Sequence, residues 1–141
     1  MNTERSIVLE NAVSLLYWVM LGAALLLLLR GHNAPGGGFI AALVAVAATA
    51  ARALVYGTAA ARARMPLGPL GLSALGLALA AASGLPALFQ EQAFLTHWWG
   101  ELAAGPLALE LSTVLLFDIG VALCVWGALG GFCVRLLEAM R

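Results

Sequence analysis

The sequence is poor in charged residues, and all of its basic residues are arginine. Only 10% of its 141 residues are charged, whereas 63% are hydrophobic and the mean hydropathy is +1.00. Soluble domains typically carry about 25% charged residues, so this composition excludes an ordinary soluble domain. Seven basic residues balance seven acidic ones. No basic tract is present, and we therefore expect no nucleic acid partner.

The sequence also has few residues that could bind a metal or catalyse a reaction. Its two cysteines, Cys124 and Cys133, share one apolar run without metal-ligand spacing, so we interpret them as small packing residues. The spacing of His97, Glu101 and Glu91 matches no metal-ligand signature. No phosphate-binding loop, dinucleotide fingerprint or nucleophile elbow occurs. We therefore expect no enzyme activity, no metal and no cofactor.

Long apolar runs dominate the rest of the sequence. A bilayer core about 30 Å thick needs about 20 helical residues to span it. The sequence therefore predicts an all-α integral membrane protein, a single membrane domain over residues 1–141 with four transmembrane helices at residues 7–29, 36–56, 67–89 and 110–134. The segment 91–109 between the last two spans contains His97-Trp98-Trp99. It is predicted to lie as a loop along the interface, where tryptophan is enriched.

The arginines predict the orientation of the four spans. With four spans, both termini and the middle loop share one side of the membrane. That side would hold six arginines: Arg5, Arg52, Arg62, Arg64, Arg135 and Arg141. The other side would hold only Arg30. Cytoplasmic segments carry the excess of positive charge. We therefore expect both termini to be cytoplasmic.

Small residues predict close contacts between helices. Gly76, Ala80 and Gly84 recur every four residues in the third run, and Gly127 and Gly131 do so in the fourth. Such small-xxx-small patterns allow membrane helices to approach closely. We therefore expect the third and fourth spans to use these faces for helix packing.

Three larger side chains in the first two runs have expected positions. Tyr17 and Trp18 lie too deep in the first run for an interfacial aromatic belt, so we expect both to pack against another helix. Arg52 lies near the end of the second run. Its long side chain is expected to extend toward the headgroups.

The stretch of residues 30–39 interrupts the first two apolar runs with helix-breaking residues. Asn33 and Pro35 are suited to begin the second helix, as its cap and first residue. His32 could exchange protons near neutral pH, or it could satisfy backbone groups that the break leaves free. Three consecutive glycines admit close approach of another backbone. We expect the motif, which includes Asn33, Pro35, Gly36, Gly37, Gly38 and Phe39, to form a contact surface for another chain.

Two acidic residues stand out at the last span. Glu110 opens it, and Asp118 follows eight residues later on roughly the same side of the helix. A charged aspartate within the membrane costs several kcal/mol unless it is paired, hydrated or protonated. Asp118 therefore has either a transport role, with Glu110 and His32 as further ion-path candidates, or a structural role as a polar link between helices.

Two motifs resemble those of a known family. The run Gly31-His32-Asn33-Ala34-Pro35-Gly36-Gly37-Gly38-Phe39-Ile40 resembles a signature of the B subunit of Mrp-type (Mnh) cation/proton antiporters. The run Ser112-Thr113-Val114-Leu115-Leu116-Phe117-Asp118-Ile119-Gly120-Val121 resembles the second signature. Chain length and a four-span layout also agree, whereas residues 52–109 match in layout only.

The resemblance implies a function. It suggests a small subunit of a bacterial plasma-membrane complex that exchanges Na⁺ for H⁺ and supports pH homeostasis. Its partners would be the other subunits and the lipid bilayer. The resemblance implies that Pro35, Phe39 and Asp118 matter most. Two alternatives remain open: the equivalent subunit of a membrane-bound hydrogenase or sulfane reductase related to complex I, and a purely structural scaffold.

Overall fold

The computed structural model describes residues 7–30, 37–89, 93, 95–96, 99–104 and 107–140. The elements of these residues are, in chain order, α1 (Ile7–Arg30), α2 (Gly37–Tyr56), α3 (Thr58–Arg62), α4 (Gly68–Ala82), α5 (Leu85–Leu88), β1 (Trp99–Ala104), β2 (Leu107–Ser112) and α6 (Thr113–Ala139). Among the described residues, four segments are long and apolar enough to cross a membrane: Ile7–Arg30, Gly37–Tyr56, Gly68–Ala87 and Thr113–Ala139. The predicted helical membrane fold with four transmembrane helices is confirmed.

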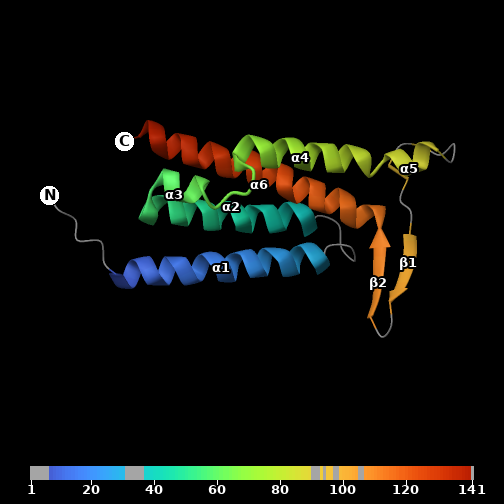
Figure 1. Ribbon diagram of the computed structural model, residues 1–141, viewed down its shortest axis with the longest axis horizontal. Coiled ribbons are helices and arrows are strands. Elements are labelled where there is room, and N and C mark those ends of the chain that lie inside the picture. The colour runs from blue at the N-terminus through green and yellow to red at the C-terminus, as the bar shows by residue number, and fades with distance from the viewer. Residues whose placement is uncertain are drawn as a thin grey trace.

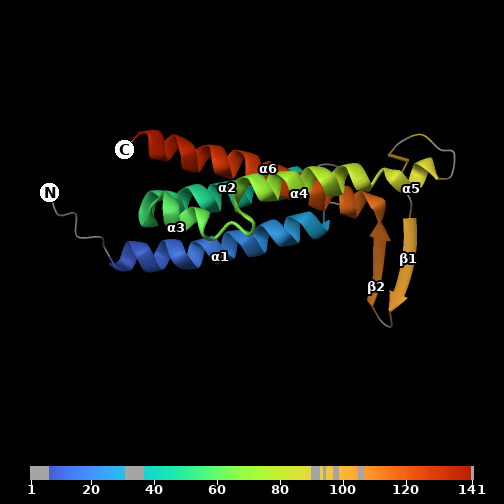
Figure 2. The ribbon, with the colours of Figure 1, turned by 45° about the horizontal axis from the view of Figure 1, so that its top comes forward.

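The four long helices pack in the spatial order α1, α2, α6, α4. Contacts join α1 to α2, α2 to α6 and α6 to α4, so α1 and α4 lie at opposite edges of the bundle (Figure 1). The short helix α3 packs on α2 and α6. The beginning of α1, helix α3 and the end of α6 gather at one end of the bundle, and the β-hairpin lies at the other (Figure 2). Only 11% of the α1 span is buried within the chain.

Local sequence explains how α2 turns into α3 and how α4 begins. Gly57 joins α2 to α3 with φ of 92°, a left-handed conformation that glycine adopts without steric cost. Pro69 lies in the first turn of α4, where its missing N–H leaves no intrahelical bond unmade. These breaks turn the chain back so that α4 runs along α6.

The segment before α6 differs from the sequence prediction. Instead of a loop, β1 and β2 form an antiparallel hairpin that pairs Trp99 with Ser112 and Glu101 with Glu110. Helix α6 therefore begins at Thr113, and the prediction that Glu110 opens the last helix is wrong. Leucine alternates with other residues over Leu107–Ser112, a period-2 pattern typical of a strand. Short apolar strands and helices are hard to distinguish, which explains the difference.

The middle of α4 packs directly on the backbone of α6. A Cβ atom added at Gly76 would clash with the backbone N of Cys124 and lie 2.5 Å from the carbonyl O of Gly120. A Cβ added at Gly120 would lie 2.5 Å from the backbone N of Ala80. The predicted small-residue contact at Gly76 and Ala80 is therefore confirmed. Gly84 lies beyond α4, immediately before α5.

The predicted second pair of glycines in α6 continues the same contact toward the beginning of α4. A Cβ added at Gly127 would lie 2.6 Å from the Pro69 carbonyl O and 2.6 Å from the Ser73 backbone N. At Gly131 it would lie 2.5 Å from the Pro69 Cβ. The Ser73 hydroxyl donates a hydrogen bond to the Pro69 carbonyl at 3.0 Å within α4. Close packing thus extends along most of α4.

A buried arginine links α1 and α2. Arg52 is only 8% exposed, and its guanidinium lies 5.4 Å from the ring centroid of Tyr17 and 4.5 Å from that of Tyr56. The expectation that Arg52 reaches toward headgroups is therefore wrong, because two aromatic faces attract the cation into the helix interface. Tyr17 is 2% exposed, as predicted for a packed residue, whereas Trp18 is 55% exposed and stacks with Arg64.

Candidate functional site

The two sequence motifs meet where α2 begins beside α6. Asp118 lies five residues after Thr113, or about 8 Å along the α6 axis at about 1.5 Å per residue. It is 8% exposed. Gly37 and Gly38, the first residues of α2, are both buried. A Cβ added at Gly38 would clash with the Asp118 carbonyl group and lie 3.0 Å from its Cα. Only glycine allows this approach.

The contact places the backbone carbonyl of Asp118 beside the beginning of α2. The first turn of α2 carries backbone N–H groups without intrahelical acceptors and the positive end of the helix dipole. The Asp118 carbonyl therefore lies near the positive end of the α2 dipole. Asp118 is the single aspartate of the sequence.

A polar contact holds α2 and α6 together farther along the same seam. The indole Nε1 of Trp126 donates a hydrogen bond to the Thr49 hydroxyl O at 2.9 Å. The same hydroxyl donates to the Ala45 carbonyl at 2.9 Å, and Thr49 is 1% exposed. The sequence prediction missed this pair. The available signal was Thr49, because it is the only hydroxyl-bearing residue of α2 before Tyr56.

Removing this hydrogen bond tests how strongly the seam holds. We expect the variants Trp126→Phe and Thr49→Val and their combination to show a coupling energy of about 0.6 kcal/mol, the average for membrane interhelical hydrogen bonds. Unfolding of the purified chain in mixed micelles would measure it through a double-mutant cycle. Strictly additive single effects would mean that the bond contributes nothing to the α2–α6 contact.

An apolar groove runs beside this seam between α1, α2 and α6. Its volume is about 240 Å³, and alanine and leucine side chains of the three helices line it together with Trp126. The lining contains no ionisable side chain. Hard cations bind through oxygen ligands, so this groove does not provide them.

The structure brings together some of the predicted site residues and separates others. Gly38 and Asp118 are in contact, so the close approach expected of a glycine is made by α6 of the same chain. Phe39 follows in α2 and is 48% exposed. Glu110 lies in β2 as the register partner of Glu101, not on one helix with Asp118. The remaining predicted residues lie outside the described residues: His32, Asn33, Pro35 and Gly36.

The fold and the site define a small membrane protein with four transmembrane helices, in which two separate motifs form one interhelical contact. The family model described as "Domain related to MnhB subunit of Na+/H+ antiporter" matches residues 8–131. The chain therefore belongs to the MnhB family.

Individual relatives agree with this family. The chain is 33% identical over 130 residues to the B subunit of a Na⁺/H⁺ antiporter from Bacillus subtilis (strain 168), a match that covers 90% of this chain and 91% of the relative. It is 29% identical over 125 residues to the protein of the same name from Alkalihalophilus pseudofirmus, covering 88% and 87%. It is also 35% identical over 107 residues to the probable A/B subunit of a K⁺/H⁺ antiporter from Rhizobium meliloti. That match covers 74% of this chain and 11% of the much longer relative.

Proposed function

We propose that this protein is a small membrane subunit of a multi-subunit antiporter that exchanges a monovalent cation, Na⁺, for protons across the bacterial plasma membrane. It acts with the other subunits of the complex rather than as an enzyme or an independent transporter. The family match over residues 8–131 and the names of its relatives support this assignment. The proposal concerns the whole chain as one membrane domain.

The observation that carries the proposal is the contact between Gly38 and Asp118. It joins the two motifs that resemble the family signatures, one at each end of the chain, into one buried site. A single carboxylate does not make a cation site, because hard cations bind several oxygen ligands. We therefore assign Asp118 to a cation or proton path that is completed by neighbouring subunits.

The exposed surface supports a role within a complex. Helix α1 lies at one edge of the bundle, and only 11% of its span is buried within the chain. Phe39 and Ile40, beside the Gly38–Asp118 contact, are 48% and 50% exposed. We assign α1 and the first turn of α2 to contacts with partner subunits and lipid.

The arrangement of arginines favours an orientation with both termini in the cytoplasm. Arg52, Arg62, Arg64 and Arg135 belong to the end of the bundle where α3 lies beside the end of α6, and Arg30 ends α1 at the opposite end (Figure 1). The positive-inside rule then places the hairpin and the Gly38–Asp118 contact at the outer side.

Replacing Asp118 tests the proposed path. Asparagine keeps the size and hydrogen-bonding capacity of aspartate but removes its charge, so we expect Asp118→Asn to assemble normally and to lose antiport by about tenfold or more. The measurement is Na⁺-driven proton movement in everted vesicles that contain the complete complex. Subunit content, measured by co-purification, reports assembly in the same vesicles.

Two further variants distinguish a role of Asp118 in the cation or proton path from a purely structural role. Gly38→Ala disturbs the same contact without changing a titratable group and should lower assembly together with antiport. Asp118→Leu should lower both. If Asp118→Asn retains full antiport while Asp118→Leu fails to assemble, Asp118 is a packing residue and the scaffold function is correct.

A further inference from the structure

A second groove lies between α3, the beginning of α4 and the second half of α6. Its volume is about 540 Å³. Its floor combines Pro69, Ser73 and Gly127 from the α4–α6 contact, and its edges include Leu70 and Ala128. Leu70 is 83% exposed. The groove is therefore largely apolar and open at the surface of the chain.

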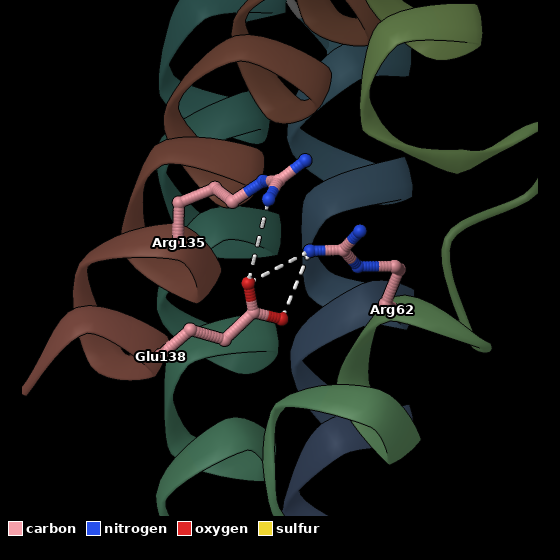
Figure 3. Close-up of polar contacts among 3 residues, drawn as sticks. All are labelled: Arg62, Arg135 and Glu138. Carbon is pink, nitrogen blue, oxygen red and sulfur yellow. Dashed lines mark hydrogen bonds and ion pairs between the residues drawn. The ribbon is translucent and has the colours of Figure 1, made fainter. Parts of the chain in front are cut away.

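Two arginines form the polar edge of this groove. The Arg62 guanidinium contacts both carboxylate oxygens of Glu138, at 2.9 and 3.2 Å, and Arg135 lies 3.8 Å from the same carboxylate (Figure 3). The single carboxylate of Glu138 thus pairs with the two guanidinium groups, so this cluster of three side chains carries a net charge of +1. Each guanidinium keeps nitrogen atoms that point away from Glu138 (Figure 3).

The groove contains the two positive groups and not the negative one. Arg62 and Arg135 both line it, and Glu138 does not. Their side chains are 37% and 74% exposed, so both can reach a ligand. An apolar floor with a cationic edge is complementary to a molecule that has an apolar chain and an anionic head.

We propose that this groove binds an anionic phospholipid. Its phosphate contacts Arg62 and Arg135, and an acyl chain lies along Leu70 and Ala128. Basic pockets between membrane helices are known to bind anionic headgroups. An acidic segment of a partner subunit is the alternative occupant, and we prefer the lipid because the groove combines an apolar lining with one excess positive charge. The inference is independent of the proposed transport function.

Native mass spectrometry of the purified full-length chain can test this binding. The probes are dimyristoyl phosphatidylglycerol and dimyristoyl phosphatidylcholine, which share acyl chains and differ in net charge. We expect tighter binding of the phosphatidylglycerol. The variant Arg62→Gln/Arg135→Gln should weaken it by about 25-fold, at about fivefold for each arginine, and leave the phosphatidylcholine unchanged.

Matched variants make the expected result specific. Arg64→Gln removes an arginine of the same region that does not line the groove and should leave binding unchanged. Glu138→Gln frees both guanidinium groups and should strengthen phosphatidylglycerol binding several-fold. Ala128→Phe fills the groove, retains the arginines and should weaken both lipids.

Three results would overturn the proposal. Equal binding of the two lipids would mean that the negative charge of the headgroup does not contribute to binding. Displacement of phosphatidylglycerol by inorganic phosphate at matched concentration would mean that the site binds free phosphate rather than lipid. Unchanged lipid binding in the double arginine variant, together with loss of partner subunits on co-purification of the complex, would assign the groove to an acidic protein segment.

Discussion

Gly76→Ala is expected to destabilise the chain by about 2 kcal/mol, within the range of about 1–3 kcal/mol typical of overpacking. The added methyl group would clash with backbone atoms of Cys124 and lie 2.5 Å from the Gly120 carbonyl O. Backbone atoms cannot move aside by a change of rotamer, so α4 and α6 must separate. Reversible unfolding of the purified chain in mixed micelles measures the free energy change.

The same substitution at Gly22 provides a matched control. Gly22 lies in α1, and a Cβ added there meets no atom within 4 Å. Alanine is favoured over glycine in a helix by about 1 kcal/mol. Gly22→Ala should therefore leave stability unchanged or raise it. Equal effects at the two positions would contradict the close α4–α6 contact.

Tyr17→Ala should have a still larger effect, about 4 kcal/mol of lost stability. Tyr17 is 2% exposed, so its truncation leaves a cavity, and large aromatic-to-alanine changes in cores cost about 3–5 kcal/mol. It also removes one of the two rings that contact Arg52. The Arg52 Nε has no hydrogen-bond partner among the described residues, so the aromatic faces are important for this buried cation.

The neighbouring aromatic residue serves as the comparison. Trp18 is 55% exposed and contacts Arg64 near the surface, where cation–π contacts contribute about 0.5–1 kcal/mol. Trp18→Ala should therefore cost about 1 kcal/mol. Tyr17→Phe keeps the ring over Arg52 and should retain most of the stability. A loss with Tyr17→Phe as large as with Tyr17→Ala would mean that the hydroxyl, not the ring, stabilises the interface.

The membrane-spanning helices could be predicted from the sequence because their length and apolar composition are physical requirements of the bilayer. The packing of Gly76 and Gly127 was also predictable, since small residues at intervals of four allow membrane helices to approach closely. The hairpin was not predicted. Its strands are six residues each, and a short apolar run does not distinguish a strand from a helix.

The environment of single polar residues was less predictable. The sequence identified Asp118 as unusual, but only the fold reveals that Gly38 is its neighbour, because that contact joins distant parts of the chain. Arg52 lies near a helix end, where extension toward headgroups is the common outcome. Tyr56 lies four residues after Arg52 on the same helix, but the burial of Arg52 also needs Tyr17 of α1, a contact that no local pattern encodes.

The α4–α6 contact has an evolutionary consequence. The facing positions have matching intervals of four, three and four residues, 69, 73, 76 and 80 on α4 and 120, 124, 127 and 131 on α6, which meet in antiparallel order. A larger side chain at one position is accommodated only if the residue opposite becomes smaller or the two helices separate. Substitutions in these two stretches should therefore arise as compensated pairs, so that each helix limits which mutations the other can accept.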